Sequence, residues 1–385
     1  MMNENAGFNI RRPANRYGKY ALTVVLLATI GFIQGYNRAM ADNGRPVLHL
    51  RVFNYNQEIP EGIVSARSAA FVLVENENTN RTAWKDLSTE VHKMMVRTGT
   101  DVIGYYNIHD VFAGPETQRY FAEDLLKREV KNILIIENQQ GSIRLTVTKF
   151  NEQGTFMDHG QNAWKSENRD LQKVLGDYRR AIGNSGQRRT NFLMADFPEF
   201  FEDTRLIKKQ RFEIFNQDLK LDKLAVPVFP GLKLPPGSET ENTADPVREK
   251  ILSYQQRWKV DSLELAGIME SYPFAYGFVG EDIDEKKLRD QGYQFILYYL
   301  HTSGKVIHKL LNYKSDKNVT DNSTMKSSGG KPELITLRAH LPVYKYYIKH
   351  IFSGEVYLGD TWDAAENWQQ ALLNHINGIK SKIKQ

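Results

Sequence analysis

Side chains able to bind a metal ion stand next to each other at two places in the chain, His109-Asp110 and Asp158-His159. A zinc site needs further ligands at a fixed spacing, such as a second histidine one helical turn away. Neither pair lies in such a frame, so both are predicted to be solvated turn residues. The sequence therefore predicts no metal site and no cofactor.

A run of acidic residues from Glu281 to Glu285 carries the carboxylates that a calcium ion prefers. The run lacks the alternating acids and the glycine of a calcium-binding loop. Two lysines follow it directly, and acidic residues suit a helix start because the helix N-terminus bears partial positive charge. The run is therefore predicted to cap a helix.

Catalytic frames are absent or weak. There is no G-x-S-x-G elbow, no persuasive S-x-x-K pair and no cysteine to act as a nucleophile. Gly99-Thr100 and Ser328 to Lys331 lack the strand and helix that flank a phosphate-binding loop. We predict that the protein is not an enzyme. The alternative is a hydrolase acting on envelope polysaccharide or peptide, because paired carboxylates meet in space and not in sequence.

Aromatic residues gather in two parts of the second half of the chain. The candidate partner-binding residues are Tyr272, Phe274, Tyr276, Phe278, Trp362 and Trp368. Tyrosine and tryptophan are favoured at protein interfaces and sugar-binding platforms because they bury a large area at low entropic cost. The same rings also suit a hydrophobic core, and the sequence leaves these alternatives open.

The first 41 residues have the pattern of an export signal. Four basic residues between Arg11 and Lys19 precede an apolar run from Tyr20 to Ile33, and Ala39-Met40-Ala41 is a small-x-small cleavage site. The apolar run is shorter than the roughly 20 residues that a membrane-spanning helix needs. We expect cleavage after Ala41, with Asp42 as the mature N-terminus, and no transmembrane span afterwards. An uncleaved N-terminal anchor is the alternative.

The charge balance and the lack of cysteine exclude some classes of partner and of membrane attachment. The signal region holds five of the 51 basic residues and one of the 46 acidic ones, which leaves 46 against 45 in the mature part. Such a near-neutral chain lacks the basic surplus that nucleic acid requires. With no cysteine the chain has no disulfides and no lipoprotein attachment site. The expected location is the bacterial periplasm or the outer envelope surface.

Hydrophobic periodicity predicts alternating strands and helices in residues 42–183. Strands are expected at 46–53, 101–108, 133–136 and 143–150, with a short one possible at 71–74. Helices are expected at 84–96, 120–130 and 167–182. Gly141 marks a hairpin turn between the third and fourth of these strands.

The same order of elements is expected to recur in residues 222–385. Strands are predicted at 224–229, 263–269, 293–300, 305–313 and 344–352, and helices at 247–258, 284–291 and 364–379. At an offset of 163 residues, Gly104 meets Gly267, Ile133 meets Ile296 and Gly141 meets Gly304. We therefore predict an internal duplication, giving two tandem α/β (α+β) modules of mixed sheet.

Two further segments have a distinct composition. Residues 184–221 are rich in phenylalanine, with acidic and basic residues in similar number, and are predicted to form an interdomain helix or brace. Residues 315–333 are rich in Ser, Asn, Lys and Gly and are predicted to be a mobile loop.

The order strand, helix, strand, helix, hairpin, helix resembles the small N-terminal domain of the TolB family. The segments nearest to it are Val130 to Phe150 and Tyr293 to Tyr313, each a short helix end followed by two strands around a glycine. The resemblance implies an envelope domain that detects partner proteins. Export, near-neutral charge and the lack of catalytic frames point the same way. We expect a non-enzymatic binding or scaffold component of an envelope assembly, with a glycan-binding module as a further alternative.

Overall fold

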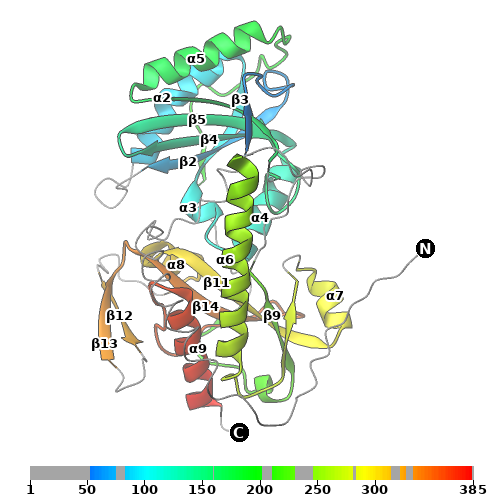
Figure 1. Ribbon diagram of the computed structural model, residues 1–385, viewed down its shortest axis with the longest axis vertical. Helices are drawn as coiled ribbons and strands as arrows, with labels where there is room; N and C mark the ends of the chain where they lie inside the picture. The colour runs from blue at the N-terminus through cyan, green and yellow to red at the C-terminus, as the bar shows by residue number, and fades with distance from the viewer. Residues whose placement is uncertain are drawn as a thin grey trace, which may run out of the picture. The chain divides into compact units, whose positions relative to one another are not determined.

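The computed structural model describes residues 53–74, 83–158, 160–201, 210–229, 246–280, 283–313, 321–326 and 333–383. The predicted signal, its cleavage site at Ala39, Ala41 and Asp42, and all but the last residue of the strand predicted at 46–53 lie outside these ranges. Within them, no helix combines the length and apolarity that crossing a bilayer requires. The described chain is a mixture of helices and two mixed sheets, as predicted (Figure 1).

The first module is built on a seven-stranded sheet with the strand order β1-β6-β5-β4-β2-β3-β7. Its elements are β1 (Asn54–Asn56), β2 (Arg67–Val74), α2 (Ala83–Thr98), β3 (Asp101–Asn107), α3 (Ile108–Val111), α4 (Pro115–Lys127), β4 (Val130–Gln139), β5 (Ser142–Lys149), β6 (Asn162–Asn168), α5 (Leu171–Asn184) and β7 (Phe200–Phe201). Gln140 and Gly141, with φ of 53° and 71°, turn β4 into β5 as a two-residue hairpin.

Alternation along the central strand β2 sends side chains into two cores. Ala69, Phe71 and Leu73 pack on the face covered by α3 and α4. Ala70, Val72 and Val74 pack on the face covered by α2 and α5. Because both faces are covered, β2 is an almost continuous apolar run, as expected for a strand buried on both sides.

The second module has a six-stranded sheet with the order β8-β15-β14-β11-β9-β10 and a separate two-stranded sheet. Its elements are β8 (Arg211–Phe212), η2 (Gln217–Lys220), β9 (Lys223–Pro227), α6 (Pro246–Met269), β10 (Tyr276–Val279), α7 (Glu285–Asp290), β11 (Tyr293–Ser303), α8 (Gly304–Leu310), β12 (Asp321–Lys326), β13 (Glu333–Arg338), β14 (Pro342–His350), β15 (Val356–Tyr357) and α9 (Trp368–Lys382). Helices α6 and α9 cover one face of the larger sheet, and α7 and α8 the other.

The two larger sheets share one topology. Strand by strand, β8, β15, β14, β11, β9 and β10 take the places of β1, β6, β5, β4, β2 and β3. Every neighbouring pair also runs in the same relative direction, parallel at both ends and in the β2–β4 and β9–β11 pairs, and antiparallel elsewhere. The predicted duplication is therefore present in the fold.

A shared irregularity fixes the residue correspondence. Between β2 and β4, Arg67 pairs with Val130 and Ser68 with Asn132, so one residue of β4 is skipped. Between β9 and β11, Lys223 pairs with Tyr293 and Leu224 with Phe295, which skips one residue at the same place. Bulges are specific local features, so their recurrence supports duplication more strongly than strand order alone.

Part of the sequence of α2 also recurs in the second module. Five of the sixteen residues of α2 are identical to residues of α6 that lie 174 positions further along the chain. Trp84, Lys85, Ser88, Glu90 and Met95 correspond to Trp258, Lys259, Ser262, Glu264 and Met269. The last helices correspond at a spacing of 197, where the N-caps are Asp170 in α5 and Asn367 in α9. The modules therefore share sequence as well as topology.

The predicted offset of 163 is right in one place and wrong in others. It relates the start of β4 at Val130 to the start of β11 at Tyr293. It fails afterwards because 305–313 is mostly the helix α8 and not the returning strand. Ser303 caps α8 by accepting a hydrogen bond from the Val306 N–H. The returning strand is β14, which follows an insertion that contains α8, β12 and β13.

Two other expectations differ from the structure. The strand predicted at 263–269 is the last part of α6, and the corresponding strand is β10, within the aromatic run. In the predicted mobile loop 315–333, residues Asp321–Lys326 form β12, which pairs antiparallel with β13.

In its described part, the phenylalanine-rich segment 184–221 contains two short strands. They are β7, at the edge of the first sheet, and β8, at the edge of the second. Phe215 is buried in the second module, whereas Phe192 and Phe197 are exposed. The segment thus attaches to both sheets by edge pairing.

Candidate functional site

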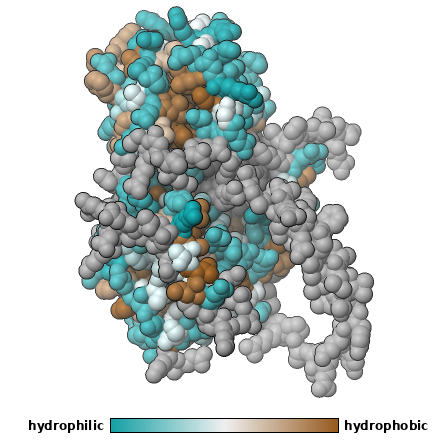
Figure 2. All heavy atoms as spheres, turned by 90° about the vertical axis from the view of Figure 1, so that its left-hand side faces the viewer, coloured by the Kyte–Doolittle hydropathy of each residue, from teal (hydrophilic) through white to brown (hydrophobic). Residues whose placement is uncertain are grey.

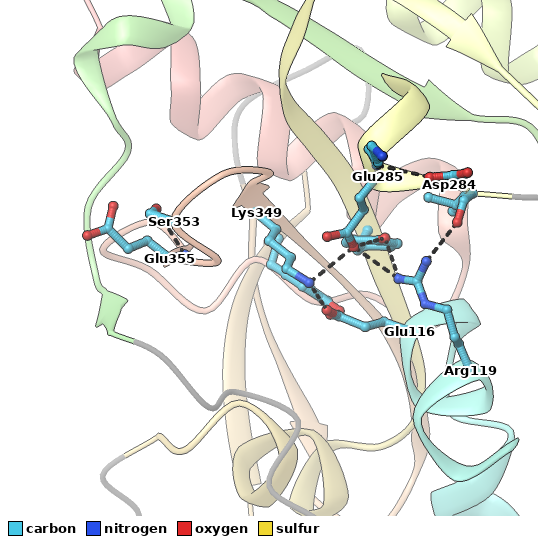
Figure 3. A network of polar contacts seen from close by, with 11 residues as sticks. Glu116, Arg119, Asp284, Glu285, Lys349, Ser353 and Glu355 are labelled. Atoms are coloured by element: carbon cyan, nitrogen blue, oxygen red, sulfur yellow. Dashed lines mark hydrogen bonds and ion pairs between the residues drawn. The ribbon is translucent and has the colours of Figure 1, made fainter. Parts of the chain in front are cut away.

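A cluster of charged side chains links α4 of the first module to the second module (Figure 3). Glu116 lies in the first turn of α4, where Pro115 starts the helix, and Glu285 lies in the first turn of α7, which Asp284 caps. Acidic residues are favoured at both places by the helix dipole. Lys349 on β14 lies between the two carboxylates.

The distances define a continuous network. The Lys349 Nζ is 2.5 Å from Glu116 Oε1 and 3.1 Å from Glu285 Oε1. The Tyr347 hydroxyl donates to Glu116 Oε2 at 2.5 Å. The guanidinium of Arg119 donates to Glu285 Oε1 at 3.0 Å and to the Ile283 carbonyl at 2.8 Å.

Charges in this network stabilise one another. Burial alone would lower the pKa of Lys349, but Glu116 and Glu285 raise it above its usual value. Burial alone would raise the pKa of Glu285, but Lys349 and Arg119 hold it below its usual value. A glycosidase acid needs a carboxyl whose pKa is raised. The pKa of Glu285 is shifted in the opposite direction, and its carboxylate joins α7 to β14 and α4 through Lys349 and Arg119.

The backbone comes close beside this cluster. The His301 N–H donates to the Ala113 carbonyl. A Cβ added to Gly114 would lie 2.3 Å from the Tyr299 carbonyl oxygen. Glycine is therefore required at 114 for the start of α4 to approach β11 so closely.

A second charged group is wholly inside the second module. Lys345 Nζ lies 2.6 Å from Asp363 Oδ1 and donates to the Tyr346 and Leu358 carbonyls. The other oxygen of Asp363 lies 2.7 Å from His375 Nδ1. Burial alone would raise the pKa of Asp363, but Lys345 and His375 lower it. All three side chains are buried, so this group is part of the core.

A polar groove of about 1030 Å³ lies on the first module between the turn after β1, strand β6 and helix α5. Among its lining carboxylates, Glu167 is paired with Arg144 at 2.8 Å, and Asp177 with Arg180 at 2.6 Å. Burial alone would raise the pKa of Glu167, but Arg144 lowers it. The groove therefore offers paired charges to a ligand.

The predicted partner-binding aromatics are divided by the fold. Tyr272 and Trp368 are buried in the core of the second module, against α6 and α9. Phe274 and Tyr276 pack partly against the same core, and Trp362 partly against the opposite one. Phe278, on β10, is 41% exposed. A role of this set in partner binding stays a prediction, and Phe278 is its most exposed member.

The outer edges of β3 and β10 differ, although the two strands correspond. In the first module β7 pairs with β3, so Tyr105 and Tyr106 are covered. In the second module no described residue pairs with the outer edge of β10. We call this the open edge, formed by Tyr276–Val279. Sequence patterns missed it because neither β7 nor β10 has the length of a recognisable strand.

The remaining candidates from the sequence are the acidic run at 281–285 and the His-Asp pairs. Asp284 accepts hydrogen bonds from the Lys286 and Lys287 N–H groups, so it caps α7 as predicted. His159, Glu281 and Asp282 lie outside the described residues. In the part of the chain that is described, no three His, Asp or Glu side chains are grouped so as to hold a metal ion. Figure 2 shows one face of the molecule, on which apolar residues form separate patches among hydrophilic ones.

Comparisons with protein-family models, with curated proteins and with solved structures find no significant match.

Proposed function

We propose that this protein is an exported, non-enzymatic component of a bacterial cell-envelope assembly and that it acts by holding protein partners. The observation that carries this proposal is the open edge of β10. An edge strand presents unpaired N–H and C=O groups, and proteins normally cover or blunt such edges. The corresponding edge in the first module is covered by β7. The open edge also presents the exposed ring of Phe278.

The charged groups of the two modules support a binding role over catalysis. Glu285 in the intermodule cluster and Glu167 in the groove both have a lowered pKa. Each forms an ion pair with a lysine or arginine side chain. Two modules linked by paired charges form a suitable platform for partners. The location rests on the sequence, namely the export pattern of residues 1–41 and the element order that resembles the TolB N-terminal domain.

The test is photocrosslinking in the cells that produce the protein. A photoreactive amino acid replaces Phe278, and in a matched control it replaces Phe352, which is 75% exposed in the loop after β14. We expect a specific protein adduct from position 278 and none of the same identity from position 352. Equal capture at both positions, or none at 278, would contradict the proposal.

Export is tested separately on the same material. The intact mass of the protein in the envelope fraction is expected to correspond to a chain that begins at Asp42. A chain that retains residues 1–41 would show an anchor instead of a cleaved signal. Retention in the cytoplasm would overturn the proposed location.

The groove of the first module favours a second candidate, a ligand-binding or hydrolytic site for envelope saccharides or peptides. Its volume of about 1030 Å³ and its polar lining suit a hydrophilic ligand. Turnover of envelope polysaccharide that is lost on replacing Glu58 and Glu61, which also line the groove, would favour this candidate.

A further inference from the structure

We propose that the open edge of β10 receives an extended segment of a partner protein, which pairs parallel to β10 and carries two consecutive aromatic residues. This inference rests on the proposed function and specifies the partner's chemistry. Strand addition at a sheet edge is a common mode of peptide recognition, in which main-chain hydrogen bonds supply affinity and side-chain pockets supply specificity.

The first module contains this arrangement within its own chain. In β7, Phe200 pairs with Tyr105 and Phe201 with Tyr106, and the strands run parallel. The Tyr105 N–H donates to the Glu199 carbonyl at 2.8 Å. A short extended segment therefore suffices to occupy this edge.

The two phenylalanines of β7 point to opposite faces of the sheet. Phe200 meets Trp84 of α2 edge to face, with ring centroids 5.4 Å apart. Phe201 stacks on Tyr106 at 4.9 Å, with an interplanar angle of 11°. Aromatic pairs in these geometries are favoured beyond the apolar area that they bury. Both faces of the edge thus select a bulky apolar ring.

The corresponding positions on the second module are also apolar. Leu224 pairs with Tyr276 and Val226 with Phe278, while in the first module Ser68 pairs with Val102 and Ala70 with Tyr105. Phe278 therefore corresponds to Tyr105, and the next residue, Val279, to Tyr106. In the helix register, Trp258 takes the place of Trp84.

Exposure differs as expected if a strand is missing from the second edge. Tyr105 is fully buried and Tyr106 is 1% exposed, whereas Phe278 is 41% exposed. Val279 is only partly buried. A parallel strand beside β10 would cover Phe278 on the α6 face with its first aromatic ring. Its second ring would cover Val279 on the α7 face.

One feature of the first edge has no counterpart. The Arg128 guanidinium lies 4.1 Å from the centroid of Phe201. The offset of 163 that relates α4 and β4 to α7 and β11 places Gln291 at this position. The position that corresponds to Arg128 therefore offers no cation to the second ring of the partner segment.

The experiment uses the purified protein and a fluorescent octapeptide with the sequence of residues 196–203, DFPEFFED, as the probe. We expect saturable binding by fluorescence anisotropy, together with slower hydrogen exchange at the amides of β10. The same peptide with both consecutive phenylalanines changed to alanine should bind at least tenfold more weakly. Phe278→Asp should weaken binding equally, whereas Phe352→Asp should leave it unchanged.

Phe278 is on the surface, so Phe278→Asp is expected to keep the unfolding midpoint of the parent protein, which shows that the variant is folded. Binding that survives Phe278→Asp, protection away from β10, or no binding at all would overturn the inference. Self-association that Phe278→Asp abolishes would identify a second copy as the occupant and would equally overturn it. A protein adduct formed at position 278 in cells would still support the proposed function in each of these cases.

Discussion

At the scale of single residues, one pair of corresponding positions has the same burial but a different chemistry. Tyr178 on α5 and His375 on α9 occupy the same place, and both are fully buried. The Tyr178 hydroxyl is 2.6 Å from Thr100 Oγ1, whereas His375 contacts Asp363. A buried polar group needs a partner, and each of these two side chains has a different one.

His301 predicts how stability depends on pH. Burial lowers its pKa from 6.5 to about 4, and its ring stacks on Tyr344 with centroids 3.8 Å apart. The folded protein therefore favours neutral histidine, so its stabilising contribution is complete above pH 6.5 and declines as the pH falls toward 4. The linked loss is on the order of 3 kcal/mol.

The measurement is urea unfolding of the parent protein and of His301→Phe at pH 7 and pH 4.5. The variant keeps a ring against Tyr344 and has no proton to gain. We expect the parent to lose more unfolding free energy than the variant between these pH values. Parallel losses would show that His301 does not account for the dependence.

At the scale of elements, close approach between α4 and β11 depends on one glycine. Gly114→Ala places a Cβ against the Tyr299 carbonyl oxygen, and the backbone must move because a carbonyl cannot rotate away. We expect a loss of about 1–3 kcal/mol of unfolding free energy, as in overpacked cores.

Gly267→Ala is the matched control. Gly267 lies within α6, and an added Cβ there meets no atom within 4 Å. Alanine is the better helix former, so this change should stabilise the protein by up to about 1 kcal/mol. Denaturant unfolding measures the change in unfolding free energy for both variants. Destabilisation by both would refute the packing argument.

At the scale of the whole molecule, the ion cluster around Lys349 predicts cooperative unfolding of the two modules. Lys349→Met leaves the Glu116 and Glu285 carboxylates without their shared cation. Because these side chains are partly exposed, we expect a loss of about 2 kcal/mol, less than for a fully buried pair.

Tryptophan fluorescence measures this coupling, because Trp84 and Trp164 lie in the first module and Trp258, Trp362 and Trp368 in the second. We expect one urea transition for the parent and two for Lys349→Met. Lys93→Met breaks the exposed Glu90–Lys93 pair and should change neither the midpoint nor the shape. A single unshifted transition in Lys349→Met would show that the cluster does not couple the modules.

Several elements could be predicted from sequence because their signals are local. The periodicity of residues 84–96, the alternation of 143–150 and the turn at Gly141 depend on near neighbours, and the structure confirms all three. Asp284 was predicted as a cap for the same reason. The returning strand of the second module was misplaced, because a hairpin signal around Gly304 does not show that Ser303 starts a helix there.

The sequence by itself predicted the mixed α/β class and the repeated order of elements, because these depend on patterns within short segments. Only the tertiary structure decided which residues correspond, since the shared bulge and strand pairing join positions far apart in the chain. It also decided that Tyr272 and Trp368 belong to the core while Phe278 is exposed. Burial of a ring depends on which strand lies beside it, and the strand beside β3 has no counterpart among the described residues beside β10.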